Sequence, residues 1–350
     1  MENLIRKYSC AGTGLIALDV MIKGKSDYNP KIFAGGSCGN VISILSYWNF
    51  NSYPIARLGN NDATDLIFED LEKWGVNLDL IEREEKGSTP IIIHRILESP
   101  LNEPKHRFEF RNPNNGKWLP SYKPVLAKKV DILSAKLPKI DIFYFDRVSR
   151  SSIELARYAK KQGALVFFEP SSNREKKQFQ ECLEISDIIK YSDQRIKSYR
   201  EEYPNIQTTL EIETSGKEGL NYRFKSDHWK SLDSFSIENA VDTAGAGDWC
   251  SAGIISQLIE KDSHNLSNLS EEKIVNALKY GQVLGAINCL YDGARGLMYQ
   301  VDRLTLNKMV DIVFERKPIS EFPSSSMNYE NNIDDNILEL ETILQSSSRN

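Results

Sequence analysis

The most informative part of this sequence is Val241-Asp242-Thr243-Ala244-Gly245-Ala246-Gly247-Asp248-Trp249-Cys250-Ser251-Ala252-Gly253, which runs from a loop into an apolar helix. The small residues Gly245, Ala246 and Gly247 let backbone N–H groups converge on one point without obstruction by larger side chains. The helix that follows adds its own unpaired N–H groups and the positive end of its dipole. The segment therefore predicts an anion site suited to a phosphate, or to the charge that develops on a phosphate during transfer.

Asp248 stands at the mouth of this predicted site, where its carboxylate can accept a proton from an attacking hydroxyl. The alternative is that Gly245 and Gly247 only shape a tight turn and that Asp248 caps the helix. For these residues taken alone the turn-and-cap alternative is favoured, and the catalytic interpretation rests on the resemblance of the complete string from Asp242 to Asp248 given below.

A second helix is predicted to begin within Ala34-Gly35-Gly36-Ser37-Cys38-Gly39-Asn40, and a strand ending near Gly59 follows it. The amide of Asn40 offers both donors and acceptors, as the binding of a polyol requires. A glycine pair before a helix is common, so this segment draws its weight from its position ahead of the 242–248 string.

In this order, the two segments resemble the two signatures of the ribokinase-like (PfkB) carbohydrate kinase family, and the resemblance covers roughly Ser9 to Arg316. It implies a ribokinase-like α/β fold: a doubly wound, mostly parallel sheet with helices on both faces, plus a small antiparallel β lid. It also implies a kinase that uses ATP and Mg²⁺ to phosphorylate a hydroxyl of a small molecule, with a sugar or sugar derivative as the first expectation.

The resemblance assigns roles to individual residues of this chain. It implies that Asp248 is the catalytic base and that the N–H groups of Gly245, Ala246 and Gly247 stabilise the transferring phosphoryl group. The implied acceptor-binding residues are Asp19, Gly35, Gly36 and Asn40, with Asp19 expected in a turn-rich stretch after the first strand. The implied nucleotide-binding residues are Ser192, Thr214, Gly216, Gly219 and Gly293.

The sequence departs from the family pattern after the strand that ends at Ile189. Family members often carry N-x-x-E there, and the Glu helps to organise magnesium and its waters. In this chain Ser192 stands in place of the Asn and Arg195 in place of the Glu. Two alternatives follow: Asp193 replaces the Glu through a water molecule, or Arg195 contacts a phosphate directly.

Relatives can bind a monovalent cation near the position of Asp242, and Arg295 could fill that space instead. These departures keep a second function class open, namely a catalytically weak ligand sensor or complex subunit. A nucleoside is the alternative acceptor, because Phe108 and Phe110 of the predicted lid could stack on a base.

The order of predicted elements agrees with a single kinase domain over residues 1–318. Strands and helices alternate from Ile140 onward, which predicts a mostly parallel sheet. Thr89–Leu97 and His106–Phe110 are instead predicted as consecutive strands, so we expect a lid drawn from about residues 13–35 and 80–112. Residues 319–350 form a polar tail expected to be partly disordered, with a short helix at Ile333–Leu344 as the alternative.

The composition limits the classes of binding partner and the cellular compartment that we expect for this protein. The net charge of -5 argues against a general nucleic-acid binder. The five cysteines form no CxxC pair, and no apolar run approaches the roughly 20 residues that a membrane span needs. We therefore expect a cytoplasmic protein with a small-molecule substrate and neither a nucleic acid nor a membrane as partner, in which two copies could pair through the exposed strand edges of the lid.

Overall fold

The computed structural model describes residues 8–23, 30–97, 105–113, 115–235, 237, 240–259, 265–316 and 322–323. A nine-stranded sheet in the order β13-β12-β11-β10-β9-β8-β1-β4-β5 forms its centre. All pairs from β5 through β1 to β11 are parallel, and β12 and β13 continue the sheet as antiparallel strands. The strands are β1 (Ser9–Thr13), β4 (Asn51–Gly59), β5 (Ile81–Glu84), β8 (Ile142–Phe145), β9 (Leu165–Phe168), β10 (Ile188–Ser192), β11 (Leu210–Thr214), β12 (Leu220–Phe224) and β13 (Lys230–Leu232).

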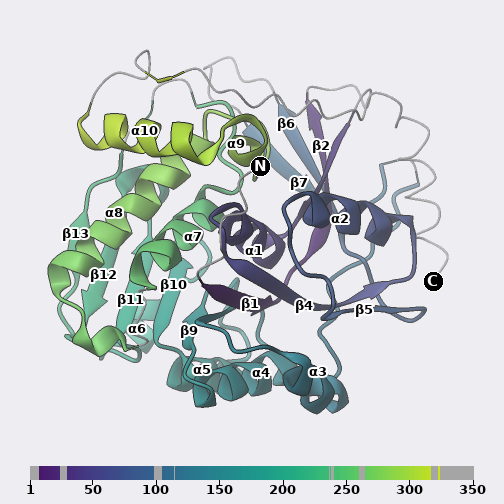
Figure 1. Ribbon diagram of the computed structural model, residues 1–350, viewed down its shortest axis with the longest axis horizontal. Coiled ribbons are helices and arrows are strands. Elements are labelled where there is room, and N and C mark those ends of the chain that lie inside the picture. Colours follow the sequence, from purple (N-terminus) through teal and green to yellow (C-terminus); the bar gives the residue numbers. More distant parts are fainter. Residues whose placement is uncertain are drawn as a thin grey trace.

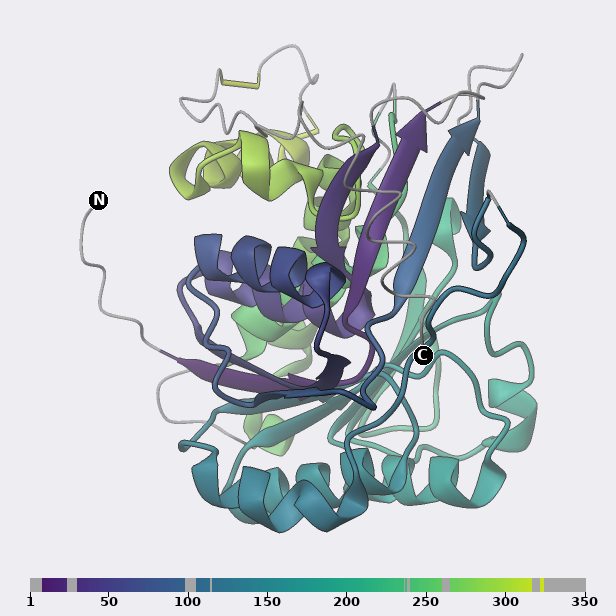
Figure 2. The same cartoon turned by 90° about the vertical axis from the view of Figure 1, so that its right-hand side faces the viewer.

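Helices cover both faces of this sheet (Figure 1 and Figure 2). One face carries α1 (Ser37–Tyr47), α2 (Asp62–Lys73), α7 (Ala246–Leu258), α8 (Glu271–Asn288), α9 (Gly296–Gln300) and α10 (Arg303–Phe314). The other face carries α3 (Val130–Lys136), α4 (Arg150–Lys161) and α5 (Lys176–Ile185), and a short helix, α6 (Tyr199–Glu202), follows β10. The doubly wound α/β fold expected from the sequence is therefore confirmed.

The core divides into two layers because side chains alternate along each strand. In β8, Ile142 and Tyr144 belong to the apolar cluster with α1, α7 and α8, whereas Phe143 and Phe145 belong to the cluster with α3, α4 and α5. Strands buried on both faces are continuous apolar runs, which is typical of parallel sheets covered by helices. Helix α7 is buried along most of its length, whereas the loop before it is partly exposed apart from the buried Asp242.

A second, four-stranded sheet rises away from the large one (Figure 2). Its order is β3-β2-β6-β7, from β2 (Ala17–Lys23), β3 (Lys31–Gly35), β6 (Ile91–Leu97) and β7 (Lys105–Glu109). The two outer pairs are antiparallel, and the central pair of β2 and β6 is parallel. Its strands lie within the two ranges predicted for the lid, although β5, from the second range, pairs with β4 in the large sheet.

The expected position of Asp19 in a turn-rich stretch was wrong. The apolar run that begins at Ser9 is two strands: β1 ends at Thr13, and the chain passes through Gly14 into β2, in which Asp19 pairs with Phe33. A Cβ on Gly14 would lie 1.6 Å from Asp146 Oδ1, so only glycine fits where the chain leaves the large sheet. Both strands are buried, and hydrophobicity therefore did not mark the boundary between them.

The predictions for the C-terminal region cannot be compared with the structure. The polar tail over 319–350 and its alternative helix at Ile333–Leu344 lie outside the described residues, apart from 322–323.

Among the helices that the structure describes, none is both long enough and apolar enough to cross a membrane.

Candidate functional site

The predicted anion site lies at the start of α7. Gly245 is the N-cap of this helix and has a φ of 73°, in the left-handed region that favours glycine. A Cβ on Gly245 would lie 2.0 Å from the carbonyl oxygen of Ala294, which packs against the turn. Trp249 Nε1 donates a hydrogen bond to the same carbonyl oxygen at 3.2 Å. The first turn of α7 contains Ala246 and Gly247, and the Ala246 N–H donates to the carbonyl oxygen of Thr243 at 3.4 Å. The role of these N–H groups in binding an anion stays a prediction.

Asp248 lies in this first turn and is linked to the acceptor segment. Its Oδ2 accepts a hydrogen bond of 2.7 Å from Asn40 Nδ2, although the two residues are 208 positions apart. Burial and the nearby charge of Glu169 raise the pKa of Asp248 from 3.8 to about 7. A carboxyl group with this pKa exchanges its proton near neutrality, as a general base requires.

Two charged residues that the sequence interpretation did not assign to the site lie beneath the anion site. Lys190, in β10, is almost fully buried and donates to Glu169 and, at 3.1 Å, to the carbonyl oxygen of Gly247. Glu169 also accepts hydrogen bonds from Tyr144 and Ser251. Two features of the sequence could have indicated these residues: a lysine within the apolar strand β10 and a Glu directly after β9. Parallel strands bring their carboxyl ends to one edge of the sheet, so side chains at these two positions are expected to lie close together.

The acceptor side is built from β2, β3 and the start of α1. The Asp19 carboxyl group lies against Gly35, where a Cβ would be 1.9 Å from Oδ2. Burial raises the pKa of Asp19 to about 7, against the opposing effects of the Gly36 N–H and the Arg295 charge. Within the described residues, Asp19 Oδ1 and Asn40 Oδ1 are buried without a hydrogen-bond partner. Buried polar atoms without partners are unusual in folded proteins, and a bound polar ligand satisfies them.

Asp146 contributes to this side and was not predicted. It follows β8 directly, and its Oδ1 accepts a hydrogen bond of 2.9 Å from the Leu15 N–H. Its Oδ2 accepts a hydrogen bond from the hydroxyl of Ser37, the first residue of α1. Asp146 therefore joins the segment that leads into β2 to the helix that carries Asn40.

Four of the five residues implied for the nucleotide lie at or just after the ends of two neighbouring strands of the large sheet. Ser192 and Thr214 end the neighbouring strands β10 and β11 and pair with each other. Gly216 and Gly219 shape the turn that follows, with φ values of 57° and 98°. Gly293 lies elsewhere, where its N–H donates to Asp242 Oδ2 at 2.9 Å.

The cation positions considered from the sequence have different surroundings. Asp242 is fully buried, and its Oδ2 lies 3.9 Å from Nδ1 of His94, which comes from β6. Arg295 does not fill the space at Asp242: its hydrogen bonds go to Asp70 and to the carbonyl oxygen of Ala34. Asp193 Oδ1 is buried and has no hydrogen-bond partner in the part of the chain that the structure describes, and Arg195 is exposed. The described residues contain no cluster of three His, Cys, Asp or Glu side chains able to hold a metal ion.

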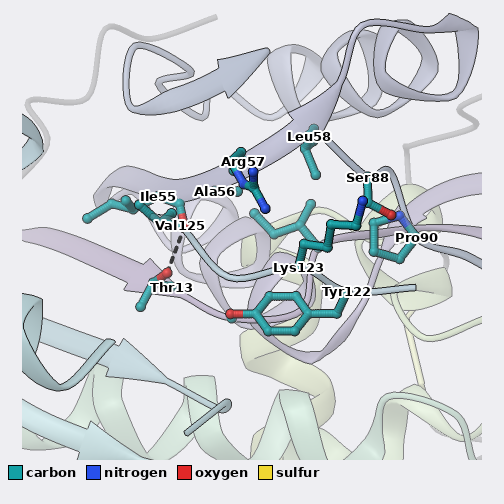
Figure 3. Close-up of a pocket in the computed structure, with 12 residues that line it drawn as sticks. Thr13, Ile55, Ala56, Arg57, Leu58, Ser88, Pro90, Tyr122, Lys123 and Val125 are labelled. Atoms are coloured by element: carbon teal, nitrogen blue, oxygen red, sulfur yellow. Dashed lines mark hydrogen bonds between the residues drawn. The ribbon is translucent and has the colours of Figure 1, made fainter. Parts of the chain in front are cut away.

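A small hollow beside β1 and β4 is distinct from this arrangement (Figure 3). It is lined by residues that include Thr13, Arg57, Tyr122 and Lys123, and its volume is about 10 Å³. A space of this size holds no more than a water molecule. No residue of the predicted site lines it.

Comparison with known proteins shows the family of this chain. The sequence matches the model of the pfkB family carbohydrate kinases over residues 25–299. It is 25% identical to fructokinase-2 of Oryza sativa subsp. japonica over 287 residues, which cover 74% of this chain and 80% of the relative. It is 24% identical to an ATP-dependent ribose-1-phosphate kinase of Halopiger xanaduensis over 278 residues, which cover 75% of this chain and 82% of the relative.

Solved structures share the fold at lower identity. The fructokinase of Xylella fastidiosa with bound ATP superimposes with a TM-score of 0.69 at 16% identity, covering 89% of this chain and 99% of the other. The ribokinase of Thermotoga maritima gives a TM-score of 0.64 at 15% identity, with coverage of 88% and 99%. The family match over residues 25–299 identifies this chain as a member of the pfkB family of carbohydrate kinases, and hence as a phosphotransferase.

Proposed function

We propose that this protein transfers the γ-phosphate of ATP to a hydroxyl group of a sugar, with D-fructose as the first acceptor to test. The observation that carries the proposal is the hydrogen bond between Asn40 and Asp248, which joins the acceptor segment to the anion site. Fructokinases among the relatives, and a fold neighbour whose structure contains bound ATP, support this choice of substrates.

In this mechanism the acceptor is held by Asp19, the backbone of Gly35 and Gly36, and the amide of Asn40. Asp248 accepts the proton of the reacting hydroxyl, and its raised pKa suits that task at neutral pH. The N–H groups at the start of α7 stabilise the negative charge on the transferring phosphoryl group. Lys190 holds the Gly247 carbonyl and Glu169 below the site, which fixes the helix start during transfer.

The nucleotide is proposed to lie along Ser192, Thr214, Gly216 and Gly219, and Gly293, which binds Asp242, is proposed as a further contact. Mg²⁺ commonly keeps several waters and binds through one or two carboxylates together with substrate phosphates. The unpartnered Asp193 Oδ1 fits such a water-mediated role. When bound, the metal would offset the charge of the ATP phosphates.

The proposal is tested by measuring ADP release with Mg²⁺ and ATP against D-fructose, D-ribose, D-gluconate and inosine. The matched control is Asp248→Asn, which keeps the hydrogen bond to Asn40 possible and removes the base. We expect acceptor-dependent turnover that falls by about 10²–10⁴-fold in the variant. Turnover that survives Asp248→Asn would overturn the base assignment. Sugar binding without turnover in the wild type would favour the ligand-sensor alternative.

Assembly through the lid is a further part of the proposal. The strands β3 and β7 are the edges of the small sheet, and Phe108, Phe110 and Trp118 expose 53%, 52% and 69% of their surface. Exposed strand edges and aromatic side chains favour association with a second copy. Light scattering after size-exclusion chromatography should give the mass of a dimer, and a monomer at all concentrations would contradict this.

A further inference from the structure

Arg295 is a buried cation in the segment that connects the anion site to the small sheet. Its side chain is 1% exposed, and its Nη2 donates to Asp70 and to the carbonyl oxygen of Ala34. Asp70, from α2, also accepts hydrogen bonds from the Ala34 N–H at 2.7 Å and from the Tyr299 hydroxyl at 2.6 Å. These contacts hold β3 against α2 and α9, whose position beside the small sheet is visible in Figure 1.

Part of this guanidinium group has no partner. Among the described residues, neither Nε nor Nη1 of Arg295 makes a hydrogen bond, and both atoms are buried. A buried donor without an acceptor costs free energy, more so when it is charged. Asp19 Oδ1 is in the same condition, and the charges of Arg295 and Asp19 act on each other. Both side chains contact the same segment, Arg295 at the carbonyl oxygen of Ala34 and Asp19 at Gly35. One ligand hydroxyl group can accept a hydrogen bond from an unused donor and donate one to an unused acceptor.

The residues next to Arg295 in the sequence contact the start of α7 and the buried Asp242. Ala294 touches Gly245 at the start of α7, and the Gly293 N–H binds Asp242. On the other side, Ala34 directly precedes Gly35, whose Cα lies against the Asp19 carboxyl group. A ligand held by Arg295 is therefore held at a fixed position relative to both the anion site and the glycine pair.

We propose that Arg295 is an acceptor-binding residue, and that one hydroxyl group of a neutral sugar accepts a hydrogen bond from it while donating one to Asp19. This proposal rests on the proposed function and names the acceptor class. The charges of two carboxyl groups, Asp70 and Asp19, act on the one Arg295 guanidinium group, so an anionic acceptor would meet more negative than positive charge. A neutral polyol satisfies both groups without that repulsion.

The decisive variant is Arg295→Lys. A lysine keeps one positive charge for Asp70 but lacks the donors of Nε and Nη1. We expect the KM for D-fructose to rise roughly 10- to 100-fold, as the loss of a hydrogen bond to a charged group predicts. The KM for ATP should stay within about twofold, because Arg295 lies on the acceptor side. The control, Arg223→Lys, alters another buried arginine far along the sheet and should lower Tm without changing either KM.

Direct binding separates this proposal from the proposed function. Calorimetric titration of D-fructose and D-gluconate should show that the wild type prefers the neutral sugar and that Arg295→Lys weakens it. If the wild type binds D-fructose without phosphorylating it, weaker binding by the variant supports Arg295 while the kinase proposal fails. An unchanged KM and Kd for D-fructose in Arg295→Lys would overturn the role of Arg295, and so would a wild type that binds D-gluconate but not D-fructose.

Discussion

Two buried arginines, Arg223 and Arg295, show how differently one side chain is used in two regions of this molecule. Arg223, in β12, and its partner Glu211, in β11, are both fully buried. Its Nε donates to Glu211 Oε2 at 2.9 Å, and its terminal nitrogens donate to the carbonyl oxygens of three residues, Tyr203, Pro204 and Asn205. Arg295 is buried to the same degree, but two of its three nitrogens have no partner among the described residues.

The difference indicates which region is complete without a ligand. At β11 and β12 every nitrogen of Arg223 is satisfied, so the cluster serves the fold. Between α2, β3 and α9, Nη2 of Arg295 makes hydrogen bonds, whereas Nε and Nη1 have no partner among the described residues. In our proposal these two unused donors belong to the acceptor site. Burial of a charge by itself therefore does not indicate function, and the contrast between the two arginines lies in their hydrogen bonds.

The largest effect is expected at the structural arginine. Replacing Arg223 by Met should lower the free energy of unfolding by about 3–5 kcal/mol, because Glu211 would remain as an uncompensated buried charge. Urea denaturation measures this loss, and the KM values of the protein that remains folded should not change. A loss of acceptor affinity in Arg223→Met would remove the contrast with Arg295.

The second effect tests the anion site. Gly245→Ala should lower kcat by about 10²–10³-fold, because the new Cβ would collide with the Ala294 carbonyl and displace the N–H groups. Gly116→Ala is the matched control, since Gly116 has a similar φ of 69° but no atom within 4 Å of the added Cβ. Equal kcat values for the two variants would show that the start of α7 is not part of the reaction centre.

The third effect is on pH dependence. Because Asp248 must be ionised to accept a proton and its pKa lies at about 7, kcat/KM should rise about tenfold per pH unit below 7 and level off above it. Glu169→Gln removes the nearby negative charge that raises this pKa, so the midpoint should move to lower pH. Rate profiles from pH 5.5 to 8.5 for both proteins measure the shift, and a flat wild-type profile would contradict the assignment.

The smallest effect is on the thermal stability of the protein and involves Asp248. Since the pKa of Asp248 rises on folding from 3.8 to about 7, the folded state binds more protons in this window, and stability falls as the pH rises. Asp248→Asn removes that penalty and should raise Tm by a few degrees at pH 8, with little difference near pH 4. The exposed Asp131→Asn serves as control, and a wild type more stable than Asp248→Asn at pH 8 would reverse the expected sign.

Local chemistry was sufficient to predict the turn at Gly245 and the close packing at the glycine pair. A left-handed residue at the start of a helix and close backbone approach both demand small residues, so Gly245, Gly35 and Gly36 carry their geometry in the sequence. The alternation of buried strands and helices from Ile140 onward predicted the large sheet for the same reason, because each element buries its own apolar face. The family resemblance added the order of the two segments and the role of Asp248.

Contacts between distant segments could be seen only in the tertiary structure. Asp19 proved to lie inside a strand, because two successive buried strands have the same hydrophobic pattern as one long strand. The pairing of Lys190 with Glu169 and of Arg295 with Asp70 joins residues 21 and 225 positions apart. Sequence spacing carries no information on such pairs, since hydrogen-bond partners and burial depend on how the sheets and helices pack. The donors that Arg295 leaves unused, and with them the proposed choice of a neutral sugar, were therefore decided by the fold.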